Sequence, residues 1–123
     1  MLKRAVAFAS LVALCASCQK FAEGRQMFRE LLALRDEIAA EFHEKVVDVT
    51  VMNGDRLTIK FINSPLLSAS SEERQKRADD VATFVAKHYK HPVAAVTTVF
   101  VVQSGGLGVS ANTSDSYVGH PKP

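Results

Sequence analysis

The side chains able to do chemistry are few in this chain, and two small groups stand out. Two thiols, Cys15 and Cys18, stand near the N-terminus, and two imidazoles, His88 and His91, are three residues apart. A thiol can be acylated or oxidised, and two imidazoles at this spacing near a helix end can share one metal ion. Which chemistry is available depends on the segments that hold these residues.

Cys18 closes a segment that is built like a secretory signal. Lys3 and Arg4 supply a positive start, residues 5–16 form an almost unbroken apolar run, and Ala16-Ser17-Cys18 ends it with two small residues before a thiol. Crossing a bilayer takes about twenty apolar residues, so this shorter run suits a signal peptide instead. We therefore expect residues 1–17 to be removed by cleavage between Ser17 and Cys18.

These residues resemble the lipobox of bacterial lipoproteins, in which two small residues precede a cysteine that is acylated. Ala16, Ser17 and Cys18 match that pattern, whereas Cys15 stands where the family usually carries Leu or Val. The resemblance implies a lipid on Cys18 and a membrane anchor in the bacterial cell envelope. Gln19, in place of Asp after the cysteine, implies the periplasmic face of the outer membrane. The alternatives are a soluble secreted protein and an uncleaved short anchor.

Loss of the leader changes the charge and the redox chemistry of the chain. Lys3 and Arg4 leave with it, so the 15 basic residues fall to 13 and equal the 13 acidic ones. A neutral domain has no general attraction for phosphate backbones, so we expect no nucleic-acid partner. No thiol remains beyond Cys18, so the fold must rely on packing without an internal disulfide.

Helical periodicity predicts two helices after a short spacer at residues 18–24. In residues 25–45 apolar side chains recur every three or four positions, while charged side chains such as Glu44 occupy a face that we expect to be solvated. Ser70 and Glu73 form a capping box that opens the second helix, and Pro92 stops it. The apolar stripes of the two helices are Met27, Leu31, Leu34, Ile38 and Phe42, and Ala78, Val81, Ala82, Val85 and Tyr89.

Alternating apolar and polar residues predict a β-hairpin between these helices. Residues 46–52 and 56–61 alternate with period two, and Asn53-Gly54 between them is a strong hairpin signal. A two-residue loop would pair Val51 with Arg56, which sets an apolar side chain beside a polar one. We therefore expect an odd loop of three or more residues, either Met52-Asn53-Gly54 or Asn53-Gly54-Asp55.

The C-terminal third changes character at residue 103. Residues 93–102 are apolar or threonine on both faces, which predicts a strand that is either interior to the sheet or covered on its second face. If the strand is central, the hairpin lies beside it. Residues 104–123 are rich in Gly and Ser and predict a flexible tail, although residues 107–109 or 116–118 leave open a short edge strand.

The order of elements predicts an α+β fold, a two-layer sandwich of the type α-β-β-α-β. The single domain at residues 25–103 would have a three-stranded sheet, with the hairpin at one side and both helices on one face. This order is similar to that of the ring-building domains of secretion-system lipoproteins and flagellar base proteins. The similarity is one of element order without a sequence motif, and fold alone does not transfer function.

No set of residues forms a catalytic motif, so we expect no enzyme. Gly105-Gly106-Leu107-Gly108 lacks the lysine of a phosphate loop. The adjacent pairs Glu72-Glu73 and Asp79-Asp80 point about 100° apart on a helix and cannot meet as an acid/base couple. A nucleophile and a base could be drawn from the C-terminal segment, but these residues lie in the expected tail, and catalysis needs groups that are held rigidly. They are Ser110, Ser114, Ser116 and His120.

Two kinds of function remain open. The first is a lipid-tethered structural or interaction module that binds another envelope protein at a sheet edge or face, or associates with itself, and has no cofactor beyond the lipid on Cys18. The second is a small-molecule or metal-binding module that uses either His88 and His91 or a pocket under the Gly-rich exit from the sheet. These two residues have a simpler interpretation as surface groups favoured by the negative end of the helix dipole.

Overall fold

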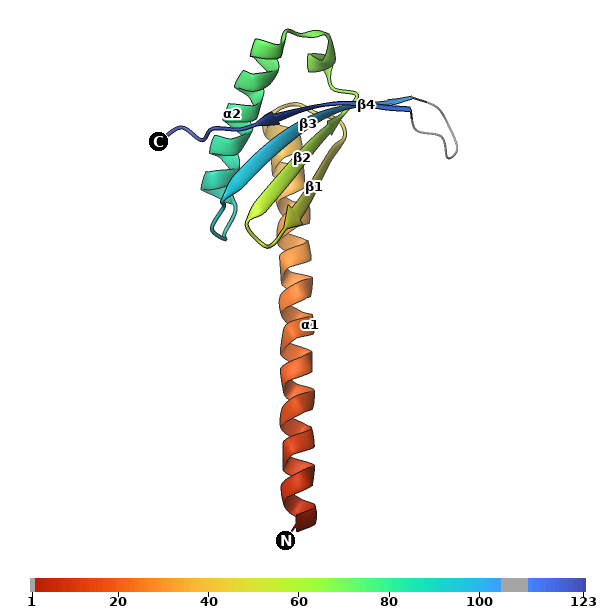
Figure 1. The fold of residues 1–123 in the computed structure, drawn as a ribbon, viewed down its shortest axis with the longest axis vertical. Coiled ribbons are helices and arrows are strands. Elements are labelled where there is room, and N and C mark those ends of the chain that lie inside the picture. The colour runs from red at the N-terminus through yellow and green to blue at the C-terminus, as the bar shows by residue number, and fades with distance from the viewer. Residues whose placement is uncertain (1, 105–110) are drawn as a thin grey trace. The chain divides into compact units, whose positions relative to one another are not determined.

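The structure is a computed structural model that describes the backbone of residues 2–104 and 111–123 and the side chains of residues 22–103 and 114–123. The chain forms two units, Met1–Glu30 and Leu31–Pro123. The first unit is the N-terminal part of helix α1 (Leu2–Glu41), and the second holds the rest of α1 and every other element (Figure 1).

Helix α1 starts earlier and ends sooner than the periodicity predicts. Residues 18–24, expected as a spacer, are helical, since they contain no proline and Gly24 costs a helix only about 1 kcal/mol relative to alanine. At the other end His43 takes a left-handed conformation (φ 54°), and the N–H of Glu44 donates to the carbonyl of Ala39 at 3.0 Å. This Schellman-type ending stops the helix at Glu41 and turns the chain toward the sheet.

The α+β class is confirmed, but the prediction of three strands is wrong. The sheet has four strands in the order β1-β2-β3-β4 (Figure 1). Their bounds are β1 (Val47–Met52), β2 (Arg56–Ile62), β3 (Ala95–Ser104) and β4 (Ala111–Val118). Strand β4 is formed by residues that the sequence assigned to the tail.

The hairpin of β1 and β2 has the odd loop that the alternation predicts. Val51 lies opposite Leu57 and Val49 opposite Ile59, so the loop is Asn53-Gly54-Asp55, the second of the two expected forms. Asn53 and Gly54 both have positive φ values, of 56° and 77°, which asparagine and glycine adopt at low cost. The register therefore keeps the apolar side chains of both strands on one face.

Strand β3 is interior, as its two apolar faces predict. It runs parallel to β2 and antiparallel to β4. A parallel pair needs a crossover, and the 3₁₀ turn η1 (Pro65–Ser68) with helix α2 (Ser71–His88) provides it. The expected capping box is present in part, since the Oγ of Ser70 accepts a hydrogen bond from the N–H of Glu73 at 3.2 Å.

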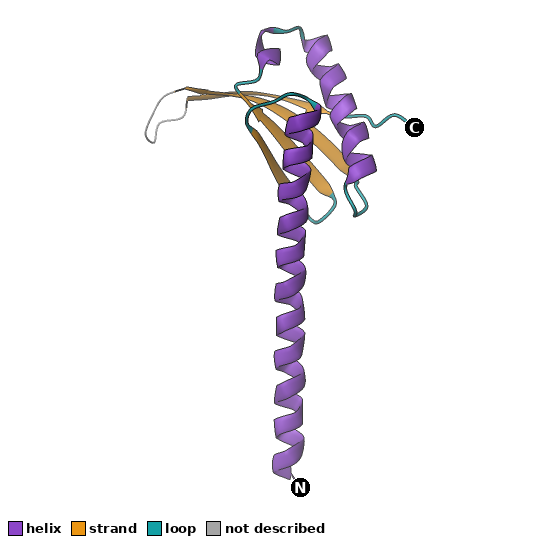
Figure 2. Ribbon diagram, turned by 180° about the vertical axis from the view of Figure 1, so that it is seen from behind, coloured by secondary structure: helices purple, strands orange, loops and turns teal. Residues whose placement is uncertain are grey.

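The core lies between one face of the sheet and the helices. In Figure 2, α2 and the last turns of α1 lie on the same side of the sheet. Phe61 links the layers, because its ring lies 6.4 Å from that of Phe42 and 5.7 Å from that of Phe100. The largest fully buried apolar side chains are Ile38 of α1, Leu57, Ile59 and Phe61 of β2, Val81 and Val85 of α2, and Phe100 of β3.

Candidate functional site

The free edge of β1 is the surface of this fold best suited to pair with another chain. Within the described residues β1 is bonded only to β2. The N–H of Ile62 donates to the carbonyl of Val46 at 3.1 Å, so Val46 directs its backbone groups toward β2. Because these directions alternate along an antiparallel strand, Val47, Val49 and Val51 direct their N–H and C=O groups outward, away from the sheet.

The side chains of β1 add apolar surface at both ends of this edge. Val46 and Met52 are 49% and 67% exposed, and both belong to the set of large hydrophobic side chains that the fold leaves in solvent. They share the outer face of the sheet with Asp48 and Thr50. Asp48 lies directly opposite Lys60 of β2, a cross-strand position at which opposite charges attract.

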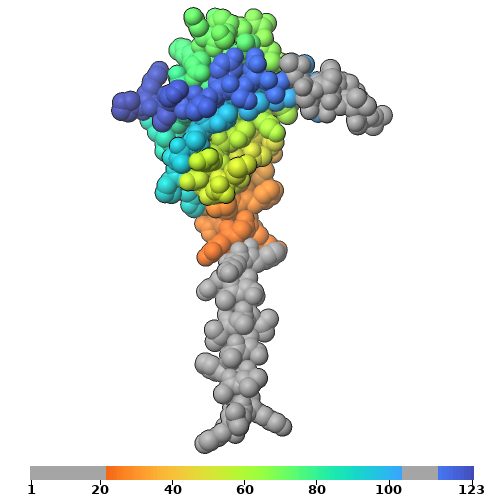
Figure 3. Space-filling model, in the orientation of Figure 1, coloured from red at the N-terminus to blue at the C-terminus, as the bar shows by residue number. Residues whose placement is uncertain are grey.

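The outer face of the sheet continues this surface toward β4. A shallow depression of about 290 Å³ lies there, floored by Ile62, Val99 and Val101 and rimmed by polar side chains. Helix α2 and the last turns of α1 lie on the other side, so this face is open in the space-filling view of Figure 3. The polar rim consists of Asp48, Lys60, Gln103 and Ser114.

A second hollow lies between the end of α1 and α2. Its apolar wall is the ring pair Phe42 and Phe84, whose centroids are 5.8 Å apart, and its rim carries Glu41, Asp80 and Lys87. The hollow is open to solvent, and its rim charges have both signs. It therefore offers no concentrated field to an ionic ligand.

His88 and His91, the predicted metal pair, lie at the end of α2. The ring of His88 stacks on Phe84 at 4.0 Å, and its Nδ1 lies 3.8 Å from Glu37. The ring of His91 instead contacts the ring of Tyr89, with centroids 5.2 Å apart. Within the side chains that the structure describes, no three histidine, cysteine or carboxylate groups come together around a common point.

A buried polar cluster joins the loop after α1, the loop after β2 and helix α2. Glu44, expected on a solvated face, is only 7% exposed. Its Oε1 accepts hydrogen bonds from the Oγ of Ser64 and from Arg77, the latter at 3.2 Å. Arg77 also lies over the ring of Phe42, 5.1 Å from the centroid. The carboxylate is thus paired, which is the condition for burying a charge.

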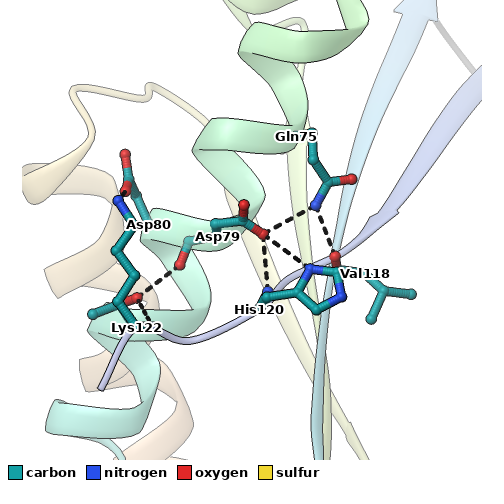
Figure 4. A network of polar contacts seen from close by, with 7 residues as sticks. Gln75, Asp79, Asp80, Val118, His120 and Lys122 are labelled. Carbon is teal, nitrogen blue, oxygen red and sulfur yellow. Dashed lines mark hydrogen bonds and ion pairs between the residues drawn. The ribbon is translucent and has the colours of Figure 1, made fainter.

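The C-terminal segment docks on α2, as Figure 4 shows. The N–H of His120 donates to Asp79 at 2.9 Å, and the N–H of Lys122 donates to the Oγ1 of Thr83 at the same distance. The backbone N–H of His120 lowers the pKa of Asp79; burial opposes this, and the Gln75 amide reinforces it. The expectation of a frayed terminus is wrong for these residues, because the side chains of α2 supply the hydrogen bonds that a solvated tail would take from water.

In the described residues, the hydrogen bonds of the His120 ring and backbone go to Asp79 and not to Ser114 or Ser116. Ser114 and Ser116 are exposed on β4, where they pair with Val101 and Val99. Ser110 and the glycine run 105–108 lie outside the described residues. The partner of the His120 ring is the carboxylate of Asp79, at 3.3 Å. The Oγ1 of Thr83 donates to the backbone carbonyl of Asp79 at 2.9 Å.

No protein-family model, curated protein or solved structure matches this chain. The resemblance of Ala16-Ser17-Cys18 to a lipobox therefore stays a prediction. The side chains of Cys15 and Cys18 lie outside the described residues, although the backbone there belongs to α1. Within the described part of the chain, no helix combines the length and apolar character that a membrane span requires.

No pattern in the sequence predicts the pairing of Glu44 with Arg77 or of Asp79 with His120. Arg77 and Glu44 are far apart in the chain, and Asp79 and His120 are farther still. The alternation of residues 46–52 does predict the valine-rich strand that forms the candidate site. Its place at the edge of the sheet is known only from the strand order.

Proposed function

We propose that this protein is a lipid-tethered interaction module of the bacterial cell envelope. The observation that carries the proposal is the N-terminal series of Lys3 and Arg4, the apolar run of residues 5–16, and Ala16-Ser17-Cys18. Cleavage before Cys18 would leave a helix that begins at the acylated residue and leads to the folded unit. The acyl chains would do the anchoring, at about 0.8 kcal/mol for each buried CH₂ group.

The surface of the folded unit supports the interaction half of this proposal. Within the described residues, the outer edge of β1 has unpaired backbone groups, and the apolar side chains of Met52 and of Val46, just before the strand, are exposed. An edge strand of this kind can accept a further strand from a partner. Gln19 after the cysteine supports anchoring at the periplasmic face of the outer membrane, as the resemblance to lipoproteins implies.

Metabolic labelling with radioactive palmitate tests the tether. We expect the wild type to incorporate label and Cys18→Ser to incorporate none, because the acylated thiol is absent. Cys15→Ser is the matched control, since it removes the neighbouring thiol and keeps Ala16, Ser17 and Cys18, and it should label like the wild type.

Label that persists in Cys18→Ser, or that disappears in Cys15→Ser, would contradict the assignment of Cys18. Fractionation of the same cells separates the two alternatives. A soluble secreted protein would leave the membrane pellet whether or not Cys18 is present. An uncleaved anchor would stay in the pellet at the full length of 123 residues.

A further inference from the structure

We propose that the partner of the β1 edge is a second copy of this chain, bound antiparallel across a two-fold axis at Val49. The inference deepens the interaction half of the proposed function and does not depend on the lipid. An isologous contact of this kind needs a self-complementary surface, because each residue of the strand meets a residue of the same strand in the other copy.

The backbone of β1 fits such a contact in one register. With Val49 opposite Val49 of the second copy, Val47 lies opposite Val51 and Val51 opposite Val47. These are the three residues that direct N–H and C=O groups outward, so every outward backbone group between them finds a partner. The pairing would join two four-stranded sheets into one continuous sheet.

The side chains support the same register. On the outer face, Val46 would lie beside Met52 of the second copy at both ends of the contact, so the two most exposed apolar side chains of this strand would shield each other. Between them, Asp48 would face Thr50. The valines on the inner face would meet valines, which pack well across paired strands.

Registers shifted by one or two residues bring less favourable side chains opposite each other. A shift by two residues in one direction places Asp48 opposite Asp48 of the second copy, and like charges directly opposite destabilise a pair. A shift in the other direction places Val47 opposite Asn53, which belongs to the turn. Odd shifts would bring inner-face side chains to the outer face of the partner sheet.

Charge at Thr50 tests the side-chain complementarity. Thr50→Asp would place a carboxylate opposite Asp48 twice in each dimer and should raise the dimer dissociation constant about tenfold. Thr50→Lys would create two opposite-charge pairs and should lower it. Thr58→Asp and Thr58→Lys are matched controls, because Thr58 lies opposite Thr50 on β2, away from the contact, and they should leave dimerisation unchanged.

Oxidative cross-linking tests the register in the full chain, with Cys15→Ser and Cys18→Ser removing the native thiols. Val49→Cys should form a disulfide-linked dimer at micromolar protein, because residues directly opposite in a bonded pair have Cα atoms about 5.5 Å apart, within the range of a disulfide. Thr58→Cys should stay monomeric. The proposal would be overturned if Val49→Cys cross-links no faster than Thr58→Cys. If Asp48→Cys cross-links faster than Val49→Cys, the register centred on Val49 is wrong.

The two proposals fail in different ways. The cross-linking background lacks Cys18 and carries no lipid, so its outcome is independent of palmitate labelling. Labelling without cross-linking would leave a tethered module whose partner is another protein. Cross-linking without labelling would leave a self-associating protein without the lipid anchor.

Discussion

The backbone N–H of His120 donates to the carboxylate of Asp79, 41 residues earlier in the chain, at 2.9 Å. The same carboxylate accepts from Gln75 at 3.0 Å, and Gln75 in turn donates to the carbonyl of Val118. One acidic side chain on α2 thus fixes the exit of β4 and the residues after it.

This relationship predicts a loss of stability in acid. The pKa of Asp79 is lowered in the folded state, chiefly by the N–H of His120. A depressed carboxyl pKa stabilises the fold above the unfolded-state value of about 4, and this contribution is lost as the pH falls through the folded-state pKa. Below pH 4, we expect the free energy of unfolding to fall less steeply with pH in Asp79→Asn than in the wild type. Urea unfolding at a series of pH values measures this.

Asp80→Asn provides the control for that experiment. Asp80 lies beside Asp79 in sequence but meets Lys122 at 3.6 Å in a solvent-exposed ion pair. Such pairs contribute about 0–1 kcal/mol, so this variant should keep the acid slope of the wild type. Equal flattening in both variants would show that docking of His120 is not the source of the slope.

Gly119 lies where the C-terminal segment crosses α2 most closely. Its N–H donates to the carbonyl of Val96 at 2.8 Å, and a Cβ at this position would stand 2.7 Å from the Cβ of Ala82 and closer still to the carbonyl oxygen of Ala78. We expect Gly119→Ala to destabilise the protein by about 1–3 kcal/mol, since the clash is with backbone that cannot yield. Thermal and urea unfolding measure the change.

Gly24→Ala is the opposite case and serves as the control. Nothing lies within 4 Å of a Cβ at Gly24, which is inside α1. Alanine there should favour the helix by up to about 1 kcal/mol. A neutral Gly119→Ala would mean that the segment after β4 does not hold its place on α2.

The parts of the fold that the sequence predicted are those with a local signal. The capping box at Ser70 and the stripe of α2 depend on residues within a few turns, and the odd loop after Met52 follows from alternation in two adjoining strands. Strand β4 has no such signal, because its described residues include one inward apolar side chain, Tyr117, which packs 5.8 Å from Phe100. Its pairing with β3 is supplied by the backbone.

The polar clusters escaped prediction for a different reason. The periodic pattern of residues 25–45 puts Glu44 on the solvated face, whereas its burial depends on Arg77, 33 residues away. A pattern along the chain shows which face is apolar but not which distant cation will neutralise a carboxylate. The strand β1 was predicted from its alternation. Its position at the edge of the sheet was not predicted, because that depends on how all the strands are ordered.

The pairing of Arg77 with Glu44 predicts an unequal pair of variants. Arg77→Met removes the cation that neutralises a buried carboxylate, while its methylene groups keep part of the packing on Phe42. We expect the free energy of unfolding to fall by about 2–3 kcal/mol. This is less than the largest losses seen when buried ion pairs are broken, because the side chain of Arg77 is itself 22% exposed. Arg35→Met, which breaks the exposed pair with Asp36, should cost at most about 0.5 kcal/mol. Similar losses in both would contradict the burial of Glu44.

Thr98 on β3 predicts a substitution that stabilises the protein. The side chain is completely buried on the inner face, and within the described residues its Oγ1 has no hydrogen-bond partner. Replacing a desolvated, unpaired hydroxyl with a methyl group of the same shape removes a penalty of about 1–3 kcal/mol, so Thr98→Val should raise the free energy of unfolding by about 1 kcal/mol or more. Thr97→Val is the matched control, because Thr97 is half-buried on the opposite face and its hydroxyl can reach water. Urea unfolding of both variants decides: a loss of stability in Thr98→Val would mean that its hydroxyl has a bonding partner in the folded protein.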